Sequence, residues 1–289
     1  MTPALTPALT DALTALRCPL CGSPLAGRRN ALRCARGHSF DIARQGYVNL
    51  DTGGGRPHQA DTTAMIAARE AFLGQRHYAP IAAAVSGLAA RLAPDRRPAV
   101  PGVVLDLAGG TGYYLAAVLT ALPGRTGICL DLAKPALRRA ARAHPRAVAV
   151  GSDVWRRFPL ADGSAAIVLS VFGPRHLAET IRVLGPAGVF LLVTPGPRHL
   201  AELVGAVGLL SVDTAKPQRV AAATAGLEQI AAEDLTYPLR LGHAAVHDLV
   251  SMGPSAHHIG AAELADRIAA LADPLTVTAS VTVAAYRLR

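Results

Sequence analysis

The fold is decided by one stretch of the chain, Val103-Val104-Leu105-Asp106-Leu107-Ala108-Gly109-Gly110-Thr111-Gly112. Its first five residues are apolar apart from Asp106 and predict a buried strand. The glycines that follow predict a tight turn into a helix that runs from Tyr113 to Ala121. A glycine-rich turn of this kind brings backbone close to a bound ligand at the carboxyl end of a parallel sheet. The stretch therefore predicts an α/β fold that binds a nucleotide-like cofactor.

Outward from this turn, apolar runs and helical patterns alternate along the chain. After the first strand, further strands are expected at 127–131, 147–150, 166–171, 188–193 and 275–288, and helices at 62–73, 78–92, 135–143 and 178–184. Alternation of strands and helices indicates a parallel sheet covered by helices on both faces. The predicted fold class is a Rossmann-like α/β domain.

Two features of the turn favour S-adenosylmethionine over a dinucleotide. Asp106 ends the strand directly before the glycines, and the turn is shorter than G-x-G-x-x-G. Asp131 ends the second strand, where a carboxylate can accept both ribose hydroxyls, although NAD-binding folds share this feature. Asp153 follows the third strand and can accept from the adenine amino group, with Val154 beside the ring. A helix cap or turn remains the alternative interpretation of Asp106 and Asp153.

A second motif lies near the N-terminus, where Cys18, Cys21, Cys34 and His38 form the pattern C-x2-C-x12-C-x3-H. Two close pairs separated by a spacer that returns as a hairpin are typical of a tetrahedral zinc site. Free cysteines or disulfides are the alternative, and a cytoplasmic chain disfavours disulfides. Four protein ligands leave no open position, so the zinc is expected to be structural. The fourth cysteine, Cys129, is interpreted as a buried strand residue.

The two motifs divide the chain into a zinc-binding module at 1–50, a glycine-rich linker at 51–61 and a catalytic domain at 62–289. Gly22 and Gly37 are expected at positive φ in the zinc knuckles. The module is rich in arginine: Arg17, Arg28, Arg29, Arg33, Arg36 and Arg44. Such a surface suits recognition of RNA, and a solvated cap on the catalytic domain is the alternative.

The composition points in the same direction. The 289 residues carry a net charge of +9, with 29 basic and 20 acidic side chains, which suits a polyanionic partner. No apolar run is long enough to cross a membrane, and residues 1–16 lack the features of a signal peptide. A cytoplasmic protein that contacts no membrane is expected.

These residues resemble the RlmA family of 23S rRNA guanine-N1 methyltransferases, closest to the TlrB-type macrolide-resistance branch. The blocks that carry the resemblance are 18–22, 37–50, 77–80, the glycine turn and 194–200. The resemblance implies that Cys18, Cys21, Cys34 and His38 hold zinc. It also implies that Tyr78, Gly110, Thr111 and His199 contact S-adenosylmethionine, and that 172–175 borders the target base. The family further allows a homodimer whose two catalytic domains share one RNA cleft.

Where the family has the first glycine of the turn, this chain has Ala108, which is tolerable if its φ stays negative. The full set of predicted cofactor-binding residues is Tyr78, Asp106, Gly109, Gly110, Thr111, Gly112, Asp131, Leu132, Asp153, Val154, Phe172 and His199.

Methyl transfer to guanine N1 requires removal of a proton or stabilisation of the O6-enolate form. Arg175 or Arg198 could stabilise that form, and His176 is a candidate base. The expected function is methylation of N1 of a guanine in a domain II hairpin of 23S rRNA, conferring macrolide resistance. A methyltransferase of an antibiotic pathway that acts on a small molecule and keeps the zinc module as a lid is the alternative. A catalytically silent RNA-binding protein is a third hypothesis, which the intact cofactor motif disfavours.

Overall fold

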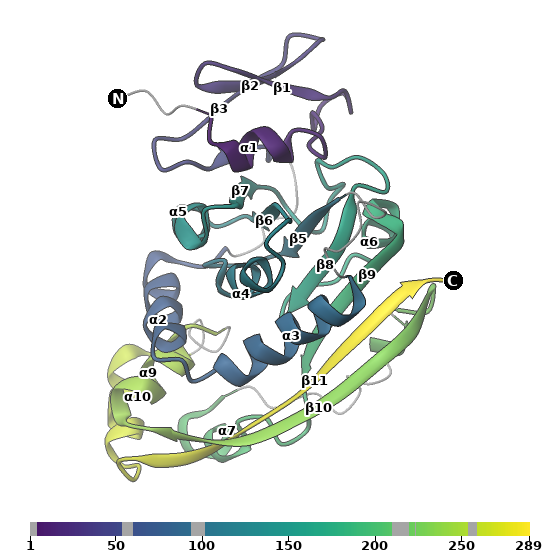
Figure 1. Cartoon of the computed structure of the whole chain (residues 1–289). Coiled ribbons are helices and arrows are strands. Elements are labelled where there is room, and N and C mark those ends of the chain that lie inside the picture. The colour runs from purple at the N-terminus through teal and green to yellow at the C-terminus, as the bar shows by residue number, and fades with distance from the viewer. Residues whose placement is uncertain (1–4, 54–59, 94–101, 210–219, 223, 254–258) are drawn as a thin grey trace.

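A computed structural model describes residues 5–53, 60–93, 102–209, 220–222, 224–253 and 259–289 of the chain (Figure 1). One large sheet crosses the molecule, with a small sheet at the N-terminal end. The described part contains no helix that is both long and apolar enough to cross a membrane.

The large sheet has the order β10-β11-β9-β8-β5-β6-β7-β4. Its strands are β4 (Val48–Asn49), β5 (Val103–Leu107), β6 (Gly127–Asp131), β7 (Ala147–Gly151), β8 (Ala165–Val171), β9 (Leu184–Pro195), β10 (Leu227–Leu241) and β11 (Leu275–Leu288). All neighbours pair in parallel from β4 to β9, whereas β11 pairs antiparallel with both β9 and β10. The strand order reverses between β5 and β8, and ligands of open α/β sheets bind at such a switch point. The predicted fold class is confirmed.

Helices flank this sheet. They are α1 (Pro7–Ala12), α2 (Thr63–Gly74), α3 (Ala79–Leu92), α4 (Tyr113–Ala121), α5 (Lys134–Ala143), α6 (Leu177–Val183), α7 (Ala201–Val207), α9 (His243–Ser251) and α10 (Ala261–Ala269). Local chemistry sets where they begin. The Thr62 hydroxyl accepts from Met65 N at 3.2 Å at the start of α2, and Pro80 lies in the first turn of α3. The bounds expected for α2 to α6 agree with the structure to within about one residue.

The two faces of the sheet bury separate hydrophobic clusters. One cluster joins α3, α4, α7, α9 and α10 to the sheet. The other joins α1 and the N-terminal module to the opposite face through Leu9, Leu16 and Leu32, all buried. Figure 1 shows α1 directly above the edge of the sheet that carries β7. The N-terminal segment therefore shares a core with the large sheet.

The N-terminal module has its own antiparallel sheet of β1 (Leu25–Arg28), β2 (Ala31–Cys34) and β3 (Ser39–Asp41). The β1–β2 hairpin is the return that the C-x2-C-x12-C-x3-H spacing predicts. The chain then adds β4 to the large sheet, where Val48 pairs with Val150. Most of the expected linker, residues 54–59, lies outside the described residues.

Strand β10 was missed by sequence reasoning. It carries four acidic or amide side chains and a proline, Pro238, so its pattern is not that of a buried strand. The strand lies at the edge of the sheet, where β11 is its neighbour among the described strands, and an edge position tolerates proline and charge. Only the tertiary arrangement makes this segment a strand.

Candidate functional site

The glycine turn lies at the carboxyl end of β5, at the switch point of the sheet. Gly110 N donates to Asp131 Oδ2 at 2.9 Å, and Ala133 N donates to Asp131 Oδ1 at 2.8 Å. Each carboxylate oxygen of Asp131 keeps a further lone pair for an added ligand. The structure thus brings the two strand ends together as the sequence predicts.

Asp106 lies beneath the turn and is 1% exposed. Its Oδ2 has no hydrogen-bond partner among the described residues. Burial, and then the nearby carboxylate of Asp131, raise the pKa of Asp106 to about 8. A Cβ on Gly109 would lie 2.5 Å from Asp106 Oδ2, so only glycine fits there. An unpartnered buried oxygen beside a side-chain-free turn fits a ligand that brings its own donor group.

The condition set for an alanine at the start of this turn is not met, since Ala108 has a φ of +50°. For a residue with a Cβ atom, this left-handed backbone conformation is less favourable than for glycine by a free energy on the order of 1 kcal/mol. Gly110 and Gly112 also have positive φ, at +58° and +77°. The turn geometry is therefore retained with local strain at Ala108, because its neighbours and the Asp131 bonds hold the backbone in place.

Arg69, on α2, was missed by sequence reasoning. A Cβ on Gly110 would lie 2.9 Å from Arg69 Nη1, so the guanidinium covers the turn. Arg69 also pairs with Asp61 at 2.6 Å and donates to Met252 O at 2.8 Å. A cation at this place can receive an anionic ligand group. No local motif marks Arg69, because α2 reaches the turn only through the tertiary fold.

Three aromatic rings meet beside the turn. The Tyr78 hydroxyl lies 3.3 Å from His199 Nε2, and the Phe172 ring stacks on His199 with centroids 5.6 Å apart. His199 Nδ1 accepts from Ser280 N at 3.2 Å, so the neutral ring carries its proton on Nε2 and directs it at Tyr78. Burial, and then Tyr237, raise the pKa of Tyr78 far above its ordinary value. The three rings therefore form an aromatic wall beside the glycine turn. The hydrogen bonds of His199 fix which of its ring nitrogens carries the proton.

Phe172 is the exposed member of this wall. It is 39% exposed and has a φ of +55°, a conformation that aromatic residues rarely adopt. The residues that follow it, Gly173 and Pro174, are held by the Ser170 hydroxyl, which donates to both of their carbonyl groups. An aromatic face held outward by a strained backbone suits stacking on a planar group.

The other predicted residues lie near these two features. Leu132 and Thr111 are half-buried beside Asp131 and the turn. Asp153 Oδ1 accepts a hydrogen bond from Trp155 N at 2.9 Å, so Asp153 has the turn role that was its alternative interpretation. Ser152 N, one residue earlier, donates to Asp131 O at 3.0 Å. Asp153 and Val154 therefore lie next to the end of β6.

The three catalytic candidates differ in what already holds them. His176 Nδ1 accepts from Glu179 N at 3.3 Å, and the ring packs edge-on against Phe158, so it acts as the cap of α6. Arg175 is half-buried and Arg198 is exposed, each close in sequence to a ring of the wall. Arg175 lies close enough to Tyr286, and Arg198 close enough to Glu202, to interact with that group electrostatically. All three residues therefore stay catalytic candidates, with His176 also serving as a helix cap.

The four predicted metal ligands converge in the N-terminal module. The Sγ atoms of Cys18, Cys21 and Cys34 and Nδ1 of His38 lie within 4.8 Å of one another. Cys18 Sγ and Cys34 Sγ each lie 3.4 Å from His38 Nδ1, and Cys21 Sγ lies 3.7 Å from Cys34 Sγ. A zinc tetrahedron with Zn–S of about 2.3 Å and Zn–N of about 2.0 Å has edges of about 3.5–3.8 Å. The donor set and its spacing fit structural zinc.

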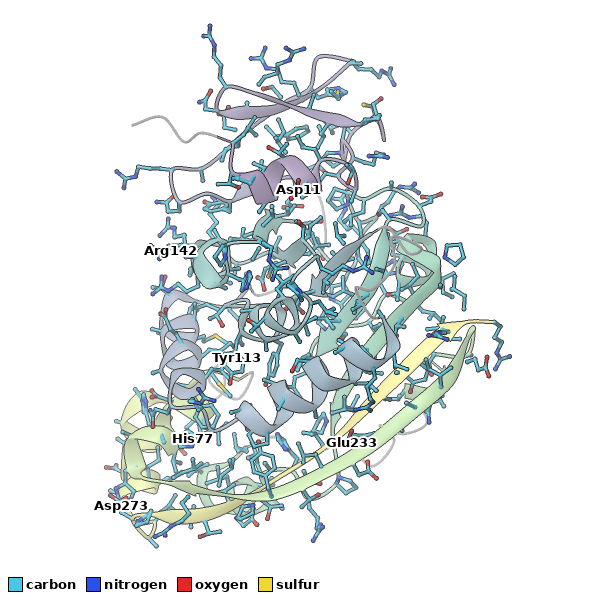
Figure 2. All side chains as sticks on the ribbon, viewed as in Figure 1. Asp11, His77, Tyr113, Arg142, Glu233 and Asp273 are labelled. Atoms are coloured by element: carbon cyan, nitrogen blue, oxygen red, sulfur yellow. The ribbon has the colours of Figure 1, made fainter. Side chains whose placement is uncertain are left out.

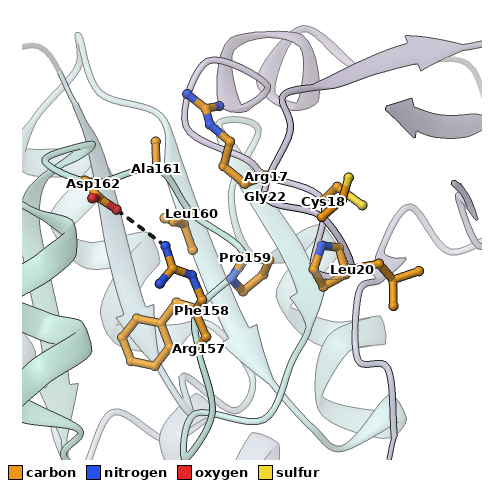
Figure 3. A pocket seen from close by; sticks show the side chains of 12 residues that line it. Arg17, Cys18, Leu20, Gly22, Arg157, Phe158, Pro159, Leu160, Ala161 and Asp162 are labelled. Atoms are coloured by element: carbon orange, nitrogen blue, oxygen red, sulfur yellow. Dashed lines mark ion pairs between the residues drawn. The ribbon is translucent and has the colours of Figure 1, made fainter. Parts of the chain in front are cut away.

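The knuckles around this cluster have the predicted backbone. Gly22 and Gly37 have φ of +71° and +86°, and their N–H groups donate to Cys18 O and Cys34 O. The first knuckle also joins the catalytic domain, since Arg17 N donates to Pro159 O at 2.8 Å. A cleft of about 570 Å³ lies along this seam, between the first knuckle and residues 157–162 (Figure 3).

Two side chains of α6 hold the backbone of the catalytic domain that lines this seam. Arg182 donates to Leu160 O at 2.7 Å and Phe158 O at 3.0 Å and pairs with Glu179, while Glu179 Oε2 accepts from Phe158 N at 2.7 Å. Arg182 and Glu179 are largely buried, at 14% and 11% side-chain exposure. The zinc module is therefore held against a stiff surface of the catalytic domain.

The fold and site define an S-adenosylmethionine-dependent methyltransferase. The features that define it are a parallel sheet with this strand order, an acidic residue before a short glycine turn and a second carboxylate bonded to that turn.

The RlmA N-terminal zinc-ribbon family matches residues 16–50. A Micromonospora griseorubida protein assigned to 23S rRNA guanine-N1 methylation is 52% identical, over 94% of this chain and 97% of its own. The 23S rRNA (guanine(748)-N(1))-methyltransferase of Streptomyces fradiae is 49% identical, over 94% and 96%. A Bacillus subtilis relative is 30% identical, over 83% and 86%.

The chain belongs to the RlmA family of 23S rRNA (guanine-N1)-methyltransferases. Its cofactors are S-adenosylmethionine and structural zinc, which the Asp106–Asp131 site and the Cys3His cluster fit.

Proposed function

We propose that this enzyme methylates N1 of a guanine in a domain II hairpin of 23S rRNA and thereby lowers macrolide binding to the ribosome. The observation that carries the proposal is that the Streptomyces fradiae relative, which modifies guanine 748, matches the chain over 94% of its length. The exposed Phe172 face and the arginines of the zinc module support an RNA substrate.

The cofactor site is proposed to consist of residues from several segments of the catalytic domain. They are Tyr78, Asp106, Gly109, Gly110, Thr111, Gly112, Asp131, Leu132, Asp153, Val154, Phe172 and His199, with Arg69 added from the structure. When bound, S-adenosylmethionine supplies a methyl group that its sulfonium already activates. Asp131 is suited to hold the ribose, and Arg69 and Asp106 to hold the charged amino-acid end of the cofactor.

The chain's own task is to present the guanine and manage its N1 proton. Phe172 offers a face on which the base can stack, and the fixed His199–Tyr78 pair excludes water from that side. Arg175 or Arg198 would stabilise negative charge at O6 as the N1 proton passes to solvent, after which N1 takes the methyl group and S-adenosylhomocysteine leaves. His176 contributes by capping α6 behind this loop.

The domain organisation proposed is a zinc-binding module at 1–50, a connection at 51–61 and the catalytic domain at 62–289, in a cytoplasmic enzyme. We also propose a homodimer whose two catalytic domains share one RNA cleft. Light scattering of the purified chain tests the dimer, and cell fractionation tests the location.

The deciding experiment supplies tritiated S-adenosylmethionine with a domain II transcript of 23S rRNA or with macrolide precursors. Label is expected in the RNA, with a reverse-transcription stop at one guanine because N1 methylation blocks base pairing. Label only in the small molecules would refute the proposal and support the antibiotic-pathway alternative. Expression in a macrolide-sensitive host then tests resistance.

A further inference from the structure

Helix α5 carries a row of cations that the cofactor site and the zinc cluster do not use. Its ten residues include Lys134, Arg138, Arg139 and Arg142 and no acidic side chain. Lys134, Arg138 and Arg142 are spaced by four residues, lie on one helix face and are exposed. We call these three residues the α5 stripe.

The α5 stripe has no partner within the described part of the chain. Among the described residues, no hydrogen bond, ion pair or ring contact involves the side chain of Lys134, Arg138 or Arg142. The fourth cation of the helix differs, because Arg139 pairs with Glu70 of α2 at 2.9 Å. On α10 the exposed Arg267 likewise pairs with Glu263 at 2.5 Å. Intramolecular pairing thus accounts for those arginines and not for the stripe.

Helix stability does not account for the stripe either. A cation near the amino end of a helix opposes the helix dipole, and Lys134 is the first residue of α5. No acidic side chain offsets it in the first turn. Only Arg142, in the last turn, lies where the dipole favours a positive charge.

The position of α5 connects the stripe to both functional sites. Its first residue follows directly on Ala133, whose N–H holds Asp131. On its inner side, Ala140 and Ala143 pack so tightly on Gly112 that a Cβ there would lie 2.9 Å from Ala143 Cβ. At its carboxyl end, Ala141 faces Gly46 of the zinc module, and a Cβ on Gly46 would lie 3.8 Å from Ala141 Cβ. The helix therefore extends rigidly from the cofactor turn to the zinc module.

Figure 2 shows Arg142 on α5 at the level where the catalytic domain meets the N-terminal module. Arg44, two residues before Gly46, is also exposed. The cations of the stripe rise about 6 Å from one to the next along the helix axis. This spacing is comparable to that of neighbouring phosphates along a nucleic-acid strand.

We propose that the α5 stripe is an RNA-backbone contact of the catalytic domain, which guides the strand from the zinc module toward the cofactor site. The proposal rests on the proposed RNA substrate. The partner chemistry is a row of phosphates, since the stripe offers point charges and donors but no apolar or aromatic group for reading bases. It predicts binding energy that depends on salt and not on sequence.

The test compares two triple variants of the full-length, zinc-loaded enzyme. One is Lys134→Gln/Arg138→Gln/Arg142→Gln. The charge-matched control is Arg91→Gln/Arg240→Gln/Arg289→Gln, which removes three exposed arginines from α3, β10 and the C-terminus. Kd for the domain II transcript is measured by fluorescence anisotropy across a range of salt, and methyl transfer is measured at saturating RNA.

The stripe variant should bind the transcript on the order of tenfold or more weakly at moderate salt. The slope of log Kd against log salt should fall by about 2, because each phosphate that a cation neutralises adds about 0.7–0.9 to it. The kcat at saturating RNA, the zinc content and the affinity for S-adenosylmethionine should match wild type. The control should keep most of the wild-type slope.

Equal Kd values and equal slopes for the two triple variants, with a wild type that methylates the RNA, would overturn the inference and leave the proposed function intact. A stripe variant with unchanged Kd and lowered kcat would also overturn it. A wild type that labels no RNA would overturn the proposed function, and this inference with it.

Discussion

The zinc cluster and the cofactor site are both built from a few polar side chains, yet they are assembled over different distances in sequence. The zinc ligands all come from residues 18–38, on two knuckles joined by one hairpin. The proposed cofactor site draws on segments from Arg69 to His199, including α2, β5, β6 and the loop after β9. A site made by local turns keeps its geometry through the bound metal. A site at the ends of sheet strands keeps its geometry only when the whole core is folded.

The two regions nevertheless share a core and a seam, since Arg17 N bonds to Pro159 O and α1 packs on the large sheet. Each region can therefore be perturbed by itself or, at the seam, together with the other. Loss of zinc, loss of the seam clamp, ionisation of Asp106 and loss of Asp131 should have progressively smaller effects.

Loss of zinc should break the N-terminal module alone. Cys34→Ser is expected to release the metal and unfold the knuckles, because structural zinc supplies on the order of 10 kcal/mol to folding of small modules. Affinity for S-adenosylmethionine should change by less than about threefold, because the glycine turn belongs to the core of the catalytic domain. Metal analysis, limited proteolysis and calorimetry measure these three results.

Cys129→Ala is the matched control for that experiment, since it removes the buried cysteine of β6. It should retain one equivalent of zinc. A Cys34→Ser protein that keeps its zinc would show that the ligand set is wrong.

Breaking the clamp beneath the seam should destabilise both regions together. Arg182→Met leaves the buried Glu179 without its cation, and removing one partner of a buried pair costs about 3–5 kcal/mol. Urea unfolding should show this loss. The double variant Arg182→Met/Glu179→Gln should recover part of it, and no recovery would mean that the pair does not act as a unit.

A pH series isolates the carboxyl beneath the glycine turn. An unfolded Asp titrates near 3.8, whereas Asp106 in the folded, cofactor-free protein has a pKa of about 8. The stability that neutral Asp106 contributes is complete below pH about 4 and is lost as the pH rises toward 8. Relative to Asp106→Asn, the wild type should therefore lose about 3–4 kcal/mol between pH 5 and pH 8.

Asp266→Asn, an exposed position on α10, provides the control for general effects of charge. Unfolding free energies at several pH values give the comparison. Parallel curves for wild type and Asp106→Asn would show that Asp106 ionises normally.

The mildest change concerns cofactor affinity. Asp131→Ala removes the acceptor of Gly110 N and Ala133 N and should weaken binding of S-adenosylmethionine by about 1–3 kcal/mol. Zinc content should not change. Asp153→Ala should weaken cofactor binding less, because one carboxylate oxygen of Asp153 already accepts a hydrogen bond from Trp155 N. Equal losses for both variants would contradict the central role given to Asp131.

Local chemistry along the chain was enough to predict several parts of this protein. A buried strand with a glycine turn, helices with clear first residues and a zinc pattern with fixed spacing all depend on neighbours within a few residues, so α4, β5, β6 and the Cys3His cluster could be predicted. The class of enzyme followed from Asp106 and the turn, and the family from short motifs spread along the chain.

The remaining features depend on partners far away in sequence. Arg69 reaches the glycine turn, β4 joins the large sheet and β10 forms its edge only in the assembled fold. Ala108 keeps a positive φ because the hydrogen bonds donated to Asp131 and the packing of α5 hold the turn around it. Hydrogen-bond partners and burial set these features in the tertiary structure, and no local pattern of residues encodes them.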